Sequence, residues 1–217
     1  MLCFLTTDCD ISSEMIREAL LEVTRVSFNR ISVDGDTSTN DTCLVLANGL
    51  AGNPSITSQG ADYDAFLEAL RALCVEMARR IAADGEGAKH MITCTVEGAT
   101  DEAQAERMAK SVISSTLTKA AIFGADANWG RVLCAMGYSG EAFDPDKVDV
   151  SFISAAGSVA VCAQGRGLDF DEEAAKRILT EHDVTIAVAM GEGNGACTCW
   201  GCDITYDYIK INGDYRT

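Results

Sequence analysis

The sequence is poor in several residue types, and each shortage argues against a class of protein. It contains only two prolines and no stretch with the composition of an interdomain linker. No apolar run approaches the roughly 20 residues that a membrane span needs. No basic segment precedes the first apolar stretch, MLCFLTT, which is itself too short for a signal peptide. We therefore expect a cytoplasmic protein without a membrane anchor.

Positive charge is also scarce. Lysine and arginine number 17 against 33 aspartates and glutamates, so the net charge is −16. Phosphate backbones and anionic lipid headgroups would be repelled by such a chain, so we predict neither nucleic acid nor a membrane as its partner. The carboxylates are spread along the chain and are typical of a solvated surface.

Histidine is rarer still, with only His90 and His182, whereas there are ten cysteines. The segment CTCWGC concentrates Cys197, Cys199 and Cys202, but a zinc site needs a fourth ligand, and the sequence offers no suitable histidine beside it. We predict ordinary strand residues here and no metal site. In a reducing compartment we expect the cysteines to be thiols rather than disulfides.

Helical and strand patterns alternate along the chain without a break in composition, which predicts one α/β domain over residues 1–217. Ser12 or Ser13 is the expected cap of the first helix, a threonine is the expected cap of the third, and Gly85 is the expected stop of the longest. The predicted helices cover 15–28, 61–84, 100–117 and 171–182. The predicted strands cover 1–7, 43–49, 90–99, 148–155, 158–165, 183–191 and 202–213, with 43–49 buried.

Two polar segments match the sequence motifs of known ligand-binding loops only in part. DGDTSTND begins like a calcium loop, but Thr39 replaces the required glycine and Val45 the final glutamate. Turns that bond their own backbone and a functional loop both remain open for it. GEGNG, residues 191–195, lacks the Lys-Ser/Thr of a phosphate-binding loop, so we predict a turn between two strands.

No self-sufficient catalytic set is present. His90 and Cys94 share one face of a predicted strand but lie about 13 Å apart along it, too far for a nucleophile and its base. In DGEGAKH, Glu86 lies between glycines and either binds a ligand amine or is a solvated residue of a helix-terminal turn. The predicted last strand runs almost to the end of the chain, which leaves the carboxylate of Thr217 near folded structure.

Four stretches together resemble one family: SFNRISVDGDTSTNDT, DGEGA, GADANWGR and WGCDITYDYIKINGDYRT. They are similar to the β chain of the ornithine acetyltransferases, the bifunctional glutamate N-acetyltransferases of arginine biosynthesis. The resemblance covers nearly the whole chain. It implies a layered sandwich with sheets packed between helices, of the self-processing N-terminal-nucleophile type, in which residues 1–217 are a single β-chain portion.

In that family a precursor cleaves itself before a threonine, which becomes the first residue of the β chain. Because MLCFLTTD matches the residues that follow this threonine, the resemblance implies that the nucleophile stands immediately before Met1 and that no catalytic residue lies in this chain. An N-terminal threonine offers a hydroxyl nucleophile and an α-amine that acts as base near neutral pH.

The resemblance implies acetyl transfer from N2-acetylornithine to glutamate through an acetyl-threonine, with acetyl-CoA as a slower donor and no cofactor. It implies an α chain from the same precursor and a heterotetramer made of two α/β pairs. Glu86, Asn212 and Thr217 match the family's substrate contacts, with the carboxylate of Glu86 opposite the charged δ-amine of acetylornithine. Lys89 and His90 stand where the family usually has Thr-Lys.

Three other functions remain open at this point. A related N-terminal-nucleophile aminopeptidase would use water as the acceptor. An acetyltransferase of specialised metabolism would use acetylornithine without making arginine. A catalytically silent subunit would need no nucleophile, and this chain contains none.

Overall fold

The computed structural model describes residues 1–215, and the predicted α/β class is confirmed by its alternating helices and strands. The chain forms two compact units, one from residues 1–30 and 36–81 and the other from residues 31–35 and from residue 82 onward. Each unit is described by itself. That residues 1–217 are a single β-chain portion stays a prediction.

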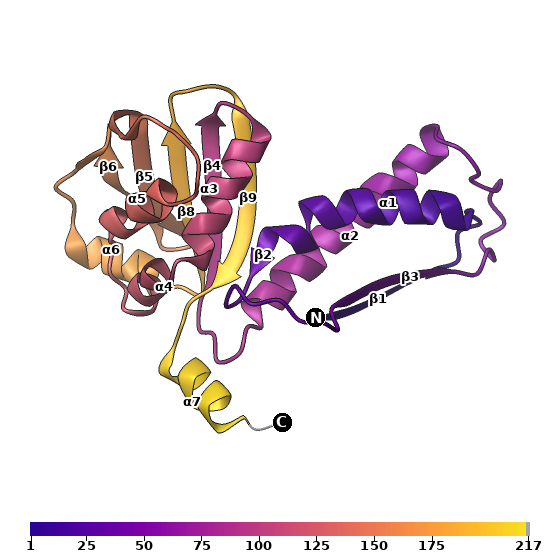
Figure 1. Ribbon diagram of the computed structural model, residues 1–217, viewed down its shortest axis with the longest axis horizontal. Coiled ribbons are helices and arrows are strands. Elements are labelled where there is room, and N and C mark those ends of the chain that lie inside the picture. Colours follow the sequence, from indigo (N-terminus) through magenta and orange to yellow (C-terminus); the bar gives the residue numbers. More distant parts are fainter. Residues whose placement is uncertain (216–217) are drawn as a thin grey trace. The chain divides into compact units, whose positions relative to one another are not determined.

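The first unit combines two helices with a small sheet (Figure 1). Ser12 caps its first helix, as predicted, by accepting a hydrogen bond from the amide of Met15 at 3.3 Å. Its elements are β1 (Leu2–Thr7), α1 (Ser13–Val26), the 3-10 turn η1 (Phe28–Arg30), β3 (Thr42–Ala47) and α2 (Ala61–Ala83), whose last two residues belong to the second unit.

The sheet of the first unit has only two strands, β1 and β3, which pair in parallel. One face is buried within the unit and carries Cys3, Leu5 and Val45. The opposite face carries exposed apolar side chains, namely Leu2, Phe4, Leu44 and Leu46. The prediction of a buried strand at 43–49 was therefore wrong. Side chains of a strand alternate between faces, and here only one face is covered.

The second unit contains a seven-stranded mixed sheet in the order β2-β9-β4-β8-β5-β6-β7 (Figure 1). Its strands are β2 (Ile31–Ser32), β4 (Met91–Ala99), β5 (Val148–Ser154), β6 (Gly157–Ala163), β7 (Arg166–Gly167), β8 (Asp183–Met190) and β9 (Gly195–Cys202). Its helical segments are α3 (Glu102–Ser114), α4 (Thr116–Phe123), α5 (Trp129–Gly137), η2 (Pro145–Lys147), α6 (Glu172–Leu179) and α7 (Tyr206–Asp214).

The core of the second unit lies between one face of this sheet and its helices. Cys94, Ile186 and Phe152 stand side by side on β4, β8 and β5, and each is at most 1% exposed. Helix α3 packs on β4 and β9, while α6 packs on β5 and β6. The alternation of apolar residues in these strands explains the arrangement, because residues two apart point to the same side of a sheet.

Two predicted elements differ in the structure. Residues 206–214 form helix α7 and not the end of a strand, since Thr205 accepts hydrogen bonds from the amides of Asp207 and Tyr208 and starts a helix. The helix predicted at 100–117 begins with Asp101 as its cap instead of a threonine, and it ends at Ser114. Ser115 then caps the separate helix α4.

One further sequence expectation, the turn at GEGNG, is tested by the structure. GEGNG connects β8 to β9, so the predicted turn is confirmed. Among residues 1–215, no disulfide bond joins two cysteines. Within the same range, no helix combines the length and the apolar character that crossing a membrane requires.

Candidate functional site

Glu86 lies on a tight turn directly after the longest helix. Helix α2 ends at Ala83, and the amide of Ala88 donates to the carbonyl oxygen of Gly85 at 2.9 Å. Gly87 has a φ of +68°. A turn closed in this way, with a positive φ at its third residue, has the pattern of a type II turn, in which glycine is favoured at that position. Glu86 is the second residue of the turn, so its side chain points outward and is exposed.

Both glycines that flank Glu86 make close contacts that exclude a side chain. A Cβ atom on Gly85 would lie 2.6 Å from the sulfur of Cys202, and one on Gly87 would lie 2.7 Å from the amide nitrogen of Tyr208. The turn thus packs directly against the end of β9 and the first turn of α7. This close approach explains, in structural terms, why glycines flank Glu86 in the motif DGEG.

Asn212, on α7, comes within hydrogen-bonding distance of Glu86. Its side-chain amide nitrogen lies 2.7 Å from Oε2 of Glu86 and 3.1 Å from the carbonyl oxygen of Tyr208. The structure therefore brings together two of the three residues that the sequence predicts as substrate contacts. Thr217, the third, lies outside the described residues.

The Glu86–Asn212 pair presents hydrogen-bond acceptors outward. An ionised carboxylate accepts only, so the amide nitrogen of Asn212 must face it, and both amide protons are used on Glu86 and Tyr208. The polar atoms of the pair that these bonds do not use are Oδ1 of Asn212 and the second carboxylate oxygen of Glu86. Both are hydrogen-bond acceptors. Such a pair suits a ligand that brings several donors and positive charge, which describes a primary ammonium group.

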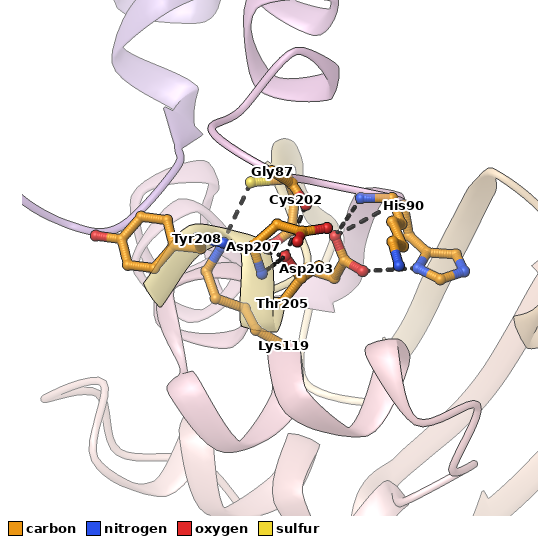
Figure 2. Close-up of polar contacts among 9 residues, drawn as sticks. Gly87, His90, Lys119, Cys202, Asp203, Thr205, Asp207 and Tyr208 are labelled. Carbon is orange, nitrogen blue, oxygen red and sulfur yellow. Dashed lines mark hydrogen bonds and ion pairs between the residues drawn. The ribbon is translucent and has the colours of Figure 1, made fainter. Parts of the chain in front are cut away.

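A cluster of polar residues, drawn in Figure 2, holds this turn in place. Asp203 follows β9, and its Oδ1 accepts hydrogen bonds from the amides of Lys89 at 2.9 Å and His90 at 3.1 Å. Its Oδ2 lies 2.7 Å from Nδ1 of His90. The hydroxyl of Thr205 donates to the carbonyl oxygen of Gly87 at 2.7 Å. The segment between β9 and α7 is thus bonded to the residues on both sides of Ala88.

The surroundings of Asp203 favour its charged form. Burial alone would raise the pKa of its carboxyl, but the hydrogen bonds from the imidazole of His90 and from the amides of Lys89 and His90 outweigh burial. The pKa of Asp203 therefore lies below its ordinary value. The Asp203 side chain is 0% exposed and that of His90 is 12% exposed, so water competes little for these bonds.

Lys119 supports the same cluster from α4. Its ammonium donates to the carbonyl oxygen of Val33 at 2.6 Å and to that of Cys202. Burial lowers the pKa of this lysine, because the charged form loses its hydration. Lys119 thereby ties the residue after β2 to the end of β9, immediately before Asp203.

Sequence reasoning did not identify Asp203, Thr205 and Lys119 as parts of the site. Asp203 and Thr205 lie inside the C-terminal stretch that carried the family resemblance, but that stretch was interpreted as a strand. Lys119 carried no signal in the sequence. His90 was considered as a partner for Cys94, as a possible zinc ligand and as a departure from the family motif, and the structure pairs it with Asp203 instead.

The other candidate segments form no separate ligand site, although Asp34 of DGDTSTND accepts a hydrogen bond at 3.0 Å from the hydroxyl of Tyr208 on α7. In DGDTSTND, the amide of Ser38 donates to Asp41 and that of Asn40 to Ser38, which favours a segment that bonds its own backbone. Cys197 and Cys199 lie buried on β9, as the strand interpretation predicted. Among the residues that the structure describes, no group of three or more histidine, cysteine, aspartate and glutamate side chains is arranged to hold a metal ion.

Comparison with known proteins identifies the family. The family model described as "ArgJ family" matches residues 1–217. The chain belongs to the ArgJ family. Over 217 residues it is 52% identical to "Arginine biosynthesis bifunctional protein ArgJ 1" of Clostridium acetobutylicum and 48% identical to "Arginine biosynthesis bifunctional protein ArgJ" of Geobacillus kaustophilus. It covers 53% and 52% of those proteins, so it spans about half the length of these curated relatives.

A solved ArgJ structure shares the fold. The crystal structure of "Arginine biosynthesis bifunctional protein argJ" from Bacillus halodurans matches with a TM-score of 0.93 at 44% identity. The match covers 99% of this chain and 100% of that one. The fold predicted from the family resemblance is therefore confirmed as that of an ArgJ protein.

Proposed function

We propose that this ArgJ-family chain is the β portion of an acyltransferase of arginine biosynthesis. The enzyme would move an acetyl group from N2-acetylornithine to glutamate, giving ornithine and N-acetylglutamate, with acetyl-CoA as a slower donor. The observation that carries the proposal is the Glu86–Asn212 pair, an acceptor site for an ammonium group in a chain of this family. In the proposed complex, Glu86 binds the δ-amine of acetylornithine, and Asn212 and Thr217 bind its other polar groups.

The proposed reaction has two steps and needs no cofactor. The hydroxyl of a threonine immediately before Met1 attacks the acetyl carbonyl, and the α-amine of the same threonine takes the hydroxyl proton. That proton passes to the nitrogen of the departing ornithine, which leaves an acetyl-threonine ester. The amine of glutamate then attacks the ester carbonyl, takes the acetyl group and restores the threonine hydroxyl.

The proposed partner is an α chain cut from the same precursor. The Bacillus halodurans chain matches this chain over nearly its full length, whereas this chain spans about half of the curated relatives, which supports a protein made of two chains. The apolar outer face of β1 and β3 is the surface we assign to the α chain, because parallel sheets are normally covered on both faces. Two α/β pairs would form the heterotetramer. We propose a cytoplasmic location, since no disulfide joins the described cysteines.

The processing step is tested by expressing the full gene and determining the intact mass and N-terminal sequence of the product. Two co-purifying chains, the second beginning Thr-Met-Leu, are expected. A single chain beginning at Met1, without a partner, would contradict the proposal and leave a silent subunit as the better interpretation.

The substrate assignment is tested with Glu86→Gln in the full enzyme. The loss of one charge-assisted hydrogen bond costs about 1.5–3 kcal/mol, so the KM for acetylornithine should rise about 10- to 100-fold. The KM values for acetyl-CoA and for glutamate, neither of which brings a δ-amine, should not rise in parallel. Equal increases for all three substrates, or none, would show that Glu86 does not bind this amine.

A further inference from the structure

The turn that presents Glu86 depends on a residue far away in the sequence. Asp203 is separated from Lys89 and His90 by 114 and 113 positions, yet its carboxylate bonds both backbone amides and the imidazole of His90. The amide of Asp203 in turn donates to the carbonyl oxygen of His90 at 3.1 Å. Four hydrogen bonds therefore join one buried residue to the exit of the Glu86 turn.

The same segment also sets the position of Asn212. Two residues after Asp203, the hydroxyl of Thr205 accepts from the amides of Asp207 and Tyr208, which starts α7, and donates to the carbonyl oxygen of Gly87. As Figure 2 shows, Asp203 and Thr205 bond His90 and Gly87 from one short stretch. The distance between the Glu86 carboxylate and the Asn212 amide therefore depends in part on the hydrogen bonds between this stretch and the turn.

We propose that Asp203 and His90 are positioning residues for the amine-binding pair, which hold Glu86 at hydrogen-bonding distance from Asn212. This inference rests on the proposed function of Glu86. The imidazole of His90 and the carboxylate of Asp203 bond one another, and their part is to fix the turn. This positioning role differs from a general contribution to stability. A displaced turn should weaken binding of the amine and raise the KM for acetylornithine, while kcat for acetyl transfer stays the same.

The experiment compares KM and kcat for variants of the full two-chain enzyme. His90→Phe keeps a planar ring but removes the bond from Nδ1 to Asp203, while leaving the bonds from Asp203 to the two amides. Since the positioning residues act through the contact of Glu86 with the amine, their effect is limited by the loss of that contact, about 10- to 100-fold. We expect His90→Phe and Asp203→Ala to raise the KM for acetylornithine about tenfold or more, with little change in kcat or in the KM for glutamate. His90→Asn, whose amide can replace the Nδ1 donor, should restore most of the lost affinity.

The chain offers a matched control. Nδ1 of His182 lies 2.7 Å from the carboxylate of Asp183, the same distance as in the His90–Asp203 pair, but these side chains are 65% and 64% exposed. His182→Phe should leave all kinetic constants within about twofold of the parent enzyme, because exposed pairs contribute little. An effect as large as that of His90→Phe would overturn the proposal.

A double mutant separates failure of this inference from failure of the proposed function. In Glu86→Gln enzyme, His90→Phe should have almost no further effect on the KM for acetylornithine, since both act through one contact. If Glu86→Gln alone changes nothing, the assignment of the amine site fails. If Glu86→Gln raises the KM but His90→Phe does not, the assignment of the amine site stands and the positioning role is overturned. The same holds if the effects of the two substitutions on the KM add. If the Asp203→Ala variant does not assemble into the two-chain enzyme, the KM of the His90→Phe variant alone tests the positioning role.

Discussion

At the scale of single residues, the buried carboxylate of Asp203 is tolerated because donors surround it. A buried charge without partners is strongly unfavourable, and Asp203 has two backbone amides and an imidazole as partners. Replacing it removes the acceptor for all three donors at once. The cost therefore comes largely from the groups that are left unsatisfied.

The depressed pKa of Asp203 predicts a contribution to stability that depends on pH. A carboxyl whose pKa is lower in the folded than in the unfolded protein stabilises the fold above the unfolded value, about 3.9. This stabilisation is lost as the pH falls from about 4 through the folded pKa. Urea unfolding measured from pH 6 to pH 2.5 should therefore show that the stability difference between the parent and Asp203→Asn shrinks at the acid end.

The control for this measurement is Asp183→Asn, which removes a carboxylate that also contacts a histidine but is 64% exposed. Its stability difference from the parent should be small, because exposed pairs contribute little. If the Asp203→Asn curve runs parallel to the parent curve down to pH 2.5, the bonds to Asp203 do not favour its ionised form.

At the scale of elements, the close contact between the Glu86 turn and α7 controls the site. Helix α7 has no buried residue, so packing alone does not hold it in place. Its position depends on the Thr205 cap, on the approach of Gly87 to the amide of Tyr208, on the hydrogen bond from the Tyr208 hydroxyl to Asp34 at 3.0 Å, and on the edge-to-face contact of Tyr206 with Phe123. A helix anchored by surface contacts alone is sensitive to one added methyl group at the point where the turn touches its backbone.

Gly87→Ala should therefore displace α7 and weaken substrate binding. The new Cβ would lie 2.7 Å from the amide nitrogen of Tyr208, and a non-glycine residue at a φ of +68° adds about 1–2 kcal/mol of strain. We expect a rise of about tenfold or more in the KM for acetylornithine, which steady-state kinetics of the full enzyme would measure.

Gly140→Ala separates backbone strain from displacement of α7. Gly140 also has a positive φ, +86°, but no atom lies within 4 Å of an added Cβ. It should destabilise the protein by about 1–2 kcal/mol while leaving the KM unchanged. A similar KM increase in both variants would show that backbone strain alone, and not displacement of α7, explains the loss.

At the scale of the whole molecule, the apolar outer face of the two-stranded sheet indicates that the first unit is incomplete by itself. Phe4 is 64% exposed and its strand neighbour Leu44 is 40% exposed, on strands that form no other pairing among residues 1–215. Burying a side chain of this size stabilises an interface by about 1.5–3 kcal/mol. The proposed α chain would supply that burial.

Phe4→Ser should weaken the association of the two chains about 10- to 100-fold. The measurement is the urea concentration at which the α and β chains separate in sedimentation, with processing verified by mass. Leu50→Ser is the matched control, since Leu50 is 81% exposed in the same unit but lies outside the two strands. If both variants dissociate like the parent, the α chain does not bind this face.

The sequence by itself determined the class of the fold and the motif of the site. Apolar periodicity predicted the central strands β4, β5, β6 and β8, because local alternation survives wherever one face of a strand is buried. The two glycines around Glu86 predicted a turn after the longest helix, and the resemblance of DGEGA to a family motif assigned Glu86 to the substrate. Both results depend on residues that are close together in the chain.

Tertiary structure alone decided the rest. Residues 206–214 alternate like a strand, yet they form a helix because Thr205 caps it and the Glu86 turn lies against its first turn. The strand at 42–47 is apolar on both faces, and only the assembled unit shows which face is covered. Asp203 reaches His90 across 113 positions because β9 pairs with β4 and brings its end beside the start of that strand. Contacts between segments that are distant in the chain leave no periodic pattern in the local sequence. Periodicity therefore could not predict them.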